Sequence, residues 1–172
     1  LGSDLFYLKG KWYLIVVDYY SRYVEYAPLT NLSCEAIVEV FKAIFARHGV
    51  PEMLISDNGP QYVGKAFVEF AKEYVFTHVT SSPKHAQCNG AAERAVQTIK
   101  RLLTKSADPY LAILSYRTSP LGNGFSPAEL LMGRKLRTPV PALQCILHPQ
   151  QHNRDVVAQW EIDNNVHQGS RT

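Results

Sequence analysis

The stretch Met53-Leu54-Ile55-Ser56-Asp57-Asn58-Gly59-Pro60 joins a short apolar segment to a strong turn signal. Its first four residues predict a β-strand, and Asp57 comes directly after them. In open α/β sheets the carboxyl ends of strands present ligand-binding side chains, so a carboxylate here suits a functional role. Asp-Asn-Gly-Pro is also typical turn chemistry, in which the aspartate caps its own backbone. Both interpretations of Asp57 can hold together.

The segments on either side of this stretch predict a mixed sheet covered by helices. Before it we expect strands at residues 4–8, 12–20 and 23–29, then a helix from Ser33 to about residue 48. After it we expect a helix, a strand at 75–79, a loop at 80–89 and a helix at 90–105. Two shorter helices begin at Asp108-Pro109 and at Ser126, the second with capping-box spacing and a stop at Gly133. This order predicts an α/β fold with a five-stranded mixed sheet flanked by helices.

Bulk properties are those of an ordinary globular chain. The 172 residues suit one domain with a substantial core, and 46% of them are apolar. The longest apolar run, residues 12–17, is too short to span a bilayer, so we expect no membrane partner. The three cysteines are widely spaced and form no Cys-x-x-Cys pair, which argues against a disulfide framework and a zinc knuckle and suits a reducing compartment.

The composition changes toward the carboxyl end. Prolines and glutamines gather after residue 137, and from about residue 150 the chain is polar without clear periodicity. We therefore expect residues 1–140 to form the folded core and residues 141–172 a polar linker or disordered tail.

Asp4, Asp57 and Glu93 are candidate metal ligands. Hard divalent cations bind carboxylate oxygens, and a pair of cations can clamp the attacking and leaving oxygens of a phosphoryl displacement. On periodicity alone, Asp18 in the second expected strand is as good a candidate as Asp4. Glu93 could equally stabilise the amino-terminal end of its helix on a solvated face.

The helix that carries Glu93 also carries positive charge. Gln97 and Lys100 follow Glu93 at i+4 and i+7, so all three side chains project along one stripe. The net charge is only +3. Two basic clusters stand out, however: Lys84, Arg94, Lys100, Arg101 and Lys105 in the first, and Arg134, Lys135 and Arg137 in the second. Such clusters suit phosphate backbones, although an ordinary solvated helix face fits them as well.

Four stretches of the chain resemble the catalytic core of retroviral and long-terminal-repeat retrotransposon integrases, closest to the Ty3/Gypsy type. They are SDLFYLKGKWYLIVVDYYSRYVEY (residues 3–26), RHGVPEMLISDNGPQY (47–62), SSPKHAQCNGAAERAVQTIK (81–100) and YRTSPLGNGFSPAELLMGRKLRT (116–138). They occur in the family's order. The resemblance implies an RNase H-like fold and a polynucleotidyl transferase that processes DNA 3′ ends and transfers strands during DNA integration.

The resemblance also assigns roles to residues. It maps the metal-binding and catalytic acids to Asp4, Asp57 and Glu93, which leaves Asp18 structural, and it implies two Mg²⁺ or Mn²⁺ ions. It places Asn89 and Lys100 near a DNA end. We expect further DNA contacts from the same helix and the loop before it: Gln97, Lys84 and Arg94. The implied partners are DNA and further copies of the chain, as a homodimer or higher multimer, and the implied location is the nucleus.

One segment departs from the family pattern. Where the loop before the helix commonly reads Tyr-x-Pro-Gln-Ser-Asn-Gly, this chain has Lys84-His85-Ala86-Gln87-Cys88-Asn89-Gly90. Loss of the proline frees the backbone and a cysteine replaces a hydroxyl, which affects DNA positioning more than metal binding.

The altered loop motivates a rival hypothesis, a host-domesticated integrase-derived domain that binds DNA or protein without catalysis. The intact acid trio counts against it. An RNase H-type nuclease is a third hypothesis, which the DNGPQY and NGAAER stretches disfavour.

Overall fold

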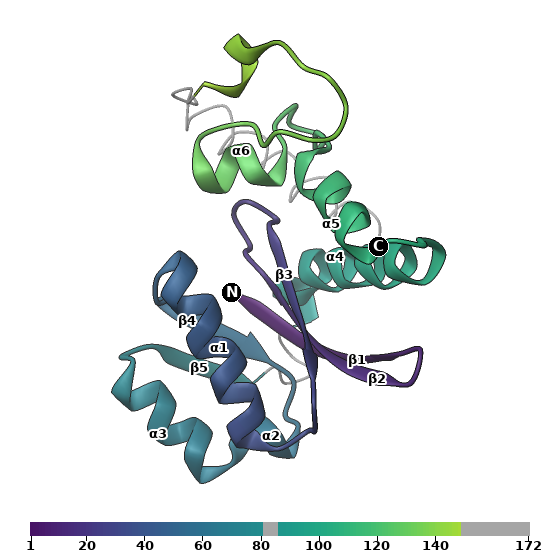
Figure 1. Ribbon diagram of the computed structural model, residues 1–172. Helices are drawn as coiled ribbons and strands as arrows, with labels where there is room; N and C mark the ends of the chain where they lie inside the picture. Colours follow the sequence, from purple (N-terminus) through teal and green to yellow (C-terminus); the bar gives the residue numbers. More distant parts are fainter. Residues whose placement is uncertain (81–85, 149–172) are drawn as a thin grey trace, which may run out of the picture. The chain divides into compact units, whose positions relative to one another are not determined.

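The computed structural model describes residues 1–80 and 86–148, and side chains are described for all of these except residues 86–93 (Figure 1). Contacts divide the chain into two units, Leu1–Ile113 and Leu114–Thr172, and each is described by itself. In the described part of the chain, no helix is both long and apolar enough to cross a bilayer.

The first unit is built on a five-stranded mixed sheet. Strands β1 (Gly2–Leu8), β2 (Lys11–Val17) and β3 (Val24–Leu29) form an antiparallel meander. Strand β4 (Met53–Ser56) pairs in parallel with β1, and strand β5 (Thr77–Thr80) pairs in parallel with β4. The order in the sheet is therefore β3-β2-β1-β4-β5. The predicted α/β fold with a mixed five-stranded sheet is confirmed.

Helices follow the strands in the predicted order. In the first unit these are α1 (Cys34–His48), α2 (Pro60–Val63), α3 (Lys65–Glu73) and α4 (Ala86–Lys105), and α5 (Pro109–Thr118) runs across the boundary of the two units. Ser33 caps α1 as expected, because its hydroxyl accepts a hydrogen bond from the Ala36 N–H at 3.2 Å. Asp108 caps α5 in the same way through the N–H groups of Tyr110 and Leu111.

The main core lies between the sheet and helices α1 to α3. Helices α1 and α3 pack side by side (Figure 1), and their aromatic rings form a continuous cluster. The rings of Phe41 and Phe45 on α1 contact those of Phe67 and Phe70 on α3 at centroid distances of 5.7–6.4 Å. Aromatic pairs at these distances add to the free energy gained from burying apolar area.

Helix α4 covers the other face of the sheet. It contacts β1 and β2, and its apolar stripe is buried: Ala95, Val96, Ile99 and Leu103. Phe6 and Ile15 are also buried but lie outside the α1 cluster, as expected when side chains alternate between the two faces of a strand. Asp4 shares the face of Phe6 and therefore points toward α4.

Four predicted boundaries were wrong by two to four residues, the first being the start of β1, which lies at Gly2 and not at residue 4. Strand β2 ends at Val17, not at residue 20, because Asp18 begins a turn. Strand β5 starts at Thr77 because Val75 adopts a positive φ of 57° and is exposed to solvent. Helix α4 starts at Ala86, so the loop expected at 80–89 is shorter, because Ala86 and Gln87 are good helix formers.

The second unit contains α6 (Pro127–Met132) and the 3₁₀ helix η2 (Gln144–Leu147). The predicted capping box is confirmed, since the Ser126 N–H donates to Glu129 Oε2 at 2.9 Å and the Glu129 N–H to Ser126 Oγ at 3.3 Å. Gly133 ends the helix at φ 68°. Helix η2 lies inside the range expected to be tail, and residues 149–172 lie outside the described residues.

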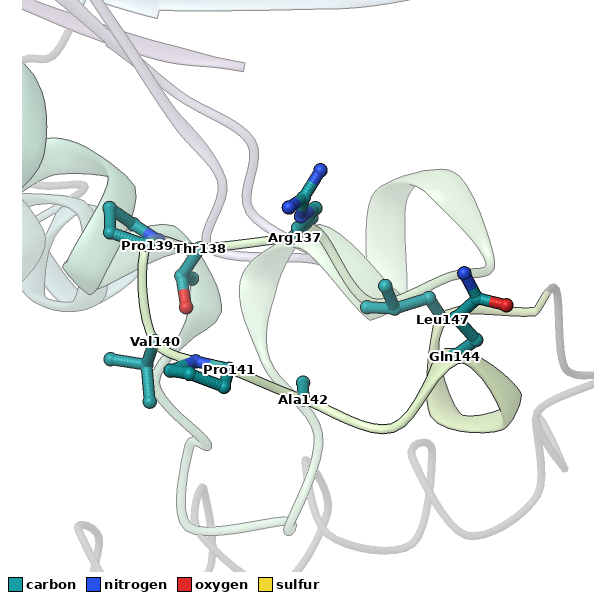
Figure 2. A pocket seen from close by; sticks show the side chains of 8 residues that line it. All are labelled: Arg137, Thr138, Pro139, Val140, Pro141, Ala142, Gln144 and Leu147. Carbon is teal, nitrogen blue, oxygen red and sulfur yellow. The ribbon is translucent and has the colours of Figure 1, made fainter.

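A hollow of about 390 Å³ opens between residues 137–142 and the side chains of Gln144 and Leu147 (Figure 2). Its lining includes one charged side chain, Arg137, and no carboxylate, histidine or cysteine. Its side-chain oxygens are the uncharged ones of Thr138 and Gln144, so the hollow offers a divalent cation no charged ligand.

Replacing Phe41 with alanine tests the aromatic core. Phe41 is fully buried among three other rings, so Phe41→Ala should lower the free energy of unfolding by about 3–5 kcal/mol. The exposed control Glu39→Ala, on the same helix, should cost no more than about 1 kcal/mol. Urea denaturation followed by circular dichroism measures both, and equal losses in the two variants would contradict the packing.

Candidate metal and nucleic-acid site

Strands β1 and β4 place Asp4 beside Asp57. The two strands are parallel, with Gly2 opposite Ile55, and extending this register by two residues sets Asp4 next to Asp57 on the same face. Asp4 and Asp57 as joint metal ligands stay a prediction, which the parallel pairing of their two strands supports.

Asp57 is held by the turn that follows its strand. The N–H of Gly59 donates to Asp57 Oδ1 at 3.2 Å, and helix α2 begins at the next residue, Pro60. This bond restricts the rotation of the side chain while the residue as a whole stays exposed. Asp57 is thus both a turn residue and a carboxylate at a strand end, as the two sequence interpretations allowed.

Asp4 is held by its own strand and by helix α4. Its Oδ1 accepts a hydrogen bond from the Leu5 N–H at 2.8 Å, and its Oδ2 accepts one from Lys100 Nζ at 3.3 Å. The ammonium of Lys100 also lies 5.5 Å from the centroid of the Phe6 ring, within cation–π range. Lys100 therefore reaches the site that the two aspartates form.

Asp18, the alternative to Asp4, lies in a turn, and its carboxylate is hydrogen-bonded within that turn. Its Oδ2 accepts hydrogen bonds from the Ser21 N–H at 2.8 Å and from the Ser21 hydroxyl at 2.6 Å. The N–H of Asp18 donates to the Tyr23 carbonyl at 2.9 Å, which closes the turn between β2 and β3. These bonds support a structural role for Asp18.

The third predicted acid, Glu93, lies on α4, seven residues before Lys100, or about 10 Å along the helix axis. Its side chain is outside the described residues, as are the side chain of Asn89 and all of Lys84. Where side chains are described, no three His, Cys, Asp or Glu residues cluster closely enough to hold a metal. Glu93 as a ligand, and Asn89 and Lys84 as DNA contacts, stay predictions.

Two further predicted DNA contacts belong to the described part of α4. Arg94 and Gln97 are both exposed, whereas Ala95 and Val96 between them are buried. The helix thus packs its apolar stripe on the sheet and turns polar groups to solvent, consistent with the stripe predicted from helical spacing.

Ser56 and His78 support the backbone at Asp57, and the sequence interpretation missed both. The buried Ser56 hydroxyl donates to the Asp57 carbonyl at 2.8 Å, and His78 Nε2 lies 2.9 Å from the same hydroxyl oxygen. Because the hydroxyl has one proton and gives it to the carbonyl, His78 Nε2 must be the donor in the second bond. Burial lowers the pKa of His78. The sequence signal was slight, a serine before the aspartate and a histidine in the next strand.

Tyr62 was also missed, although it lies in the DNGPQY run. Its ring is fully buried and its hydroxyl accepts a hydrogen bond from Ser3 Oγ at 3.3 Å. Burial raises the pKa of the phenol, the Ser3 hydrogen bond opposes this rise, and the negative charges of Asp57 and Asp4 add to it. Tyr62 therefore anchors α2 to β1, next in the chain to the turn that holds Asp57.

Comparison with known sequences identifies a family over the first half of the chain. Residues 2–86 match the family model described as an integrase core domain. An uncharacterized protein of Caenorhabditis elegans is 36% identical over 146 residues, which cover 79% of this chain and 12% of that protein. The Gag-Pol polyprotein of Walleye dermal sarcoma virus is 26% identical over 142 residues, covering 76% of this chain and 8% of the polyprotein. The chain thus spans only a small part of the relatives it matches.

Solved structures show the same fold. The catalytic core domain of BIV integrase superposes with a TM-score of 0.68 at 22% identity, covering 76% of this chain and 91% of that one. The HTLV-2 integrase catalytic core, a trimeric form in complex with magnesium, gives a TM-score of 0.61 at 21% identity, covering 76% and 93%. The simian T-cell lymphotropic virus intasome gives 0.68 at 18% identity, covering 88% and 59%.

The fold gives the class of the protein, and the sequence match gives its family. The mixed sheet with helices on both faces is an RNase H-like fold, as in integrase catalytic cores. Residues 2–86 of the chain belong to the integrase core domain family, so the resemblance drawn from the sequence is confirmed.

The pH dependence of stability tests the environment of His78. Because the folded pKa lies below the ordinary value of 6.5, the unfolded chain binds a proton that folded His78 does not. Relative to His78→Gln, the wild-type chain should therefore lose stability as the pH falls below about 6.5 and keep it above. Urea denaturation at pH 7.5 and pH 5.5 measures the difference in the free energy of unfolding between the two proteins. The contributions of the other histidines cancel in this difference because both proteins contain them. A difference that does not change with pH would contradict a partly buried imidazole that is neutral in the folded chain.

Proposed function

We propose that this chain is the metal-dependent polynucleotidyl transferase core of an integrase, which processes DNA 3′ ends and joins them to target DNA. The observation that carries the proposal is the parallel pairing of β1 with β4, whose register, continued past Ser56, would set Asp57 level with Asp4. Integrase core family membership supports the same reaction class.

The residues present fit a site for divalent cations. Neighbouring strands lie about 4.8 Å apart, so two aligned aspartates can share one hard cation through their oxygens. The side chain of Asp4 is 40% exposed and Asp57 is also exposed to solvent, so ions can reach both carboxylates. Glu93 on α4 would complete the set. Two Mg²⁺ or Mn²⁺ ions bound there would activate the attacking oxygen and stabilise the leaving one.

The chain's own residues would hold and orient the DNA. Lys100, together with Lys84 and Arg94, would bind backbone phosphates, and Asn89 and Gln97 would donate hydrogen bonds near the reacting end. The turn bond from Gly59 would keep the Asp57 carboxylate in one rotamer during the reaction. Attack by water would trim a DNA end, and attack by a DNA 3′-hydroxyl would join that end to a target. Neither step needs a protein nucleophile.

Partners and location follow from this reaction. One structural neighbour is an intasome and another is a trimeric catalytic core. By analogy, we propose that the chain works with DNA and further copies of itself, and that it acts in the nucleus, where chromosomal target DNA is found.

The substitution Asp57→Asn tests the proposal. The variant keeps the shape and the turn-forming ability of the side chain but loses its charge. Mg²⁺-dependent strand transfer should fall by about 100-fold or more, because bound metal contributes several kcal/mol of transition-state stabilisation. Asp4→Asn should behave alike. Asp18→Asn is the matched control: it makes the same chemical change in a turn carboxylate and should retain activity.

Two results would count against the proposal. Undiminished strand transfer in Asp57→Asn would remove Asp57 from the mechanism. If the folded wild-type chain, given short DNA duplexes with Mg²⁺ or Mn²⁺, produced no nicks, the non-catalytic, host-domesticated hypothesis would replace it. Activity confined to RNA–DNA hybrids would instead favour an RNase H-type nuclease.

A further inference from the structure

The ammonium of Lys100 is hydrogen-bonded to an oxygen that the proposed metal site requires. Lys100 Nζ lies 3.3 Å from Asp4 Oδ2, while the other oxygen of Asp4 accepts the Leu5 N–H. A divalent cation would bind the same oxygen at about 2.1 Å for Mg²⁺. An ammonium in its observed place would then face a doubly charged ion at close range, and the two cations would repel each other.

The contacts of Lys100 allow it to leave Asp4. Its side chain is 32% exposed and that of Asp4 is 40% exposed, so water reaches the ion pair and its net free energy is small. The second observed contact of the ammonium is the Phe6 ring, a weaker partner than a phosphate. The flexible four-carbon stem lets the ammonium swing from the strand toward solvent without a movement of α4.

We propose that Lys100 couples the binding of divalent metal to the binding of DNA. In the metal-free chain its ammonium neutralises Asp4, and a cation on Asp4 releases Lys100 to bind a DNA phosphate. The inference rests on the proposed function, and adds to it an energetic link between metal binding and DNA binding. A DNA phosphate would likewise draw Lys100 away and open Asp4 to metal, because such coupling is reciprocal.

Removing the ammonium tests the first half of the coupling. Without DNA, Lys100→Met should bind Mn²⁺ roughly three- to tenfold more tightly than the wild-type chain, because the cation no longer displaces a lysine. Arg101→Met is the matched control, since it removes the same charge from the next residue of α4, which is exposed. It should change the Mn²⁺ affinity by less than about twofold. Electron paramagnetic resonance of free Mn²⁺ measures all three affinities.

Releasing the lysine tests the second half. In EDTA, Asp4→Asn should bind a short DNA duplex more tightly than Asp57→Asn, although both lose one negative charge. The excess gain should disappear when Lys100→Met is added to each variant, since no lysine is then released. Fluorescence anisotropy of labelled duplex measures these affinities. Equal gains in the two aspartate variants would overturn the coupling.

The outcomes separate this inference from the proposed function. If Mn²⁺ binds the wild-type chain and Lys100→Met equally, or if Arg101→Met shifts the affinity as much, the coupling is wrong and the metal site stands. If Mn²⁺ binds neither protein, the metal site itself is wrong and the coupling falls with it. Thermal melting checks that each variant is folded, and Lys100→Gln replaces Lys100→Met if the latter does not fold.

Discussion

The candidate site depends on the parallel pairing of β1 with β4. Strand β1 is the first of the chain, and β4 is only four residues long, yet their register pairs Gly2 with Ile55 and, if continued, would pair Asp4 with Asp57. Because side chains in a strand alternate between faces, a shift of one residue would turn one aspartate to the opposite face. The aromatic core beneath α1 and α3 stabilises this register, since Leu54 of β4 is fully buried within it.

The residues around Asp57 differ in their exposure to solvent. Ser56 points into the buried side, where its hydroxyl joins His78 to the Asp57 carbonyl. Asp57 itself is exposed to solvent, and its side chain accepts the Gly59 N–H. This hydrogen-bonded support restricts the backbone at Asp57 without shielding the charge of its exposed carboxylate. Lys100 contacts Asp4 and offsets its charge in the absence of metal.

Part of the fold and of the candidate site was predictable from local sequence patterns. The strand and turn around Asp57, the Ser33 cap and the Ser126 capping box follow from short sequence patterns, and all were confirmed. Contacts between distant segments were not predictable in this way. Ser56 and His78 are 22 residues apart, and Asp4 and Lys100 are 96 apart, so no local periodicity relates them. Periodicity also could not separate Asp4 from Asp18; that choice came from the family resemblance, and the turn around Asp18 supports it.

The most direct test of the central claim is to locate bound Mn²⁺ in crystals of the chain by anomalous diffraction. We expect a peak within about 2.5 Å of carboxylate oxygens of both Asp4 and Asp57, with Glu93 facing it. Mn²⁺ bound elsewhere, or a structure in which the two aspartates lie on opposite faces of the sheet, would contradict a shared metal site.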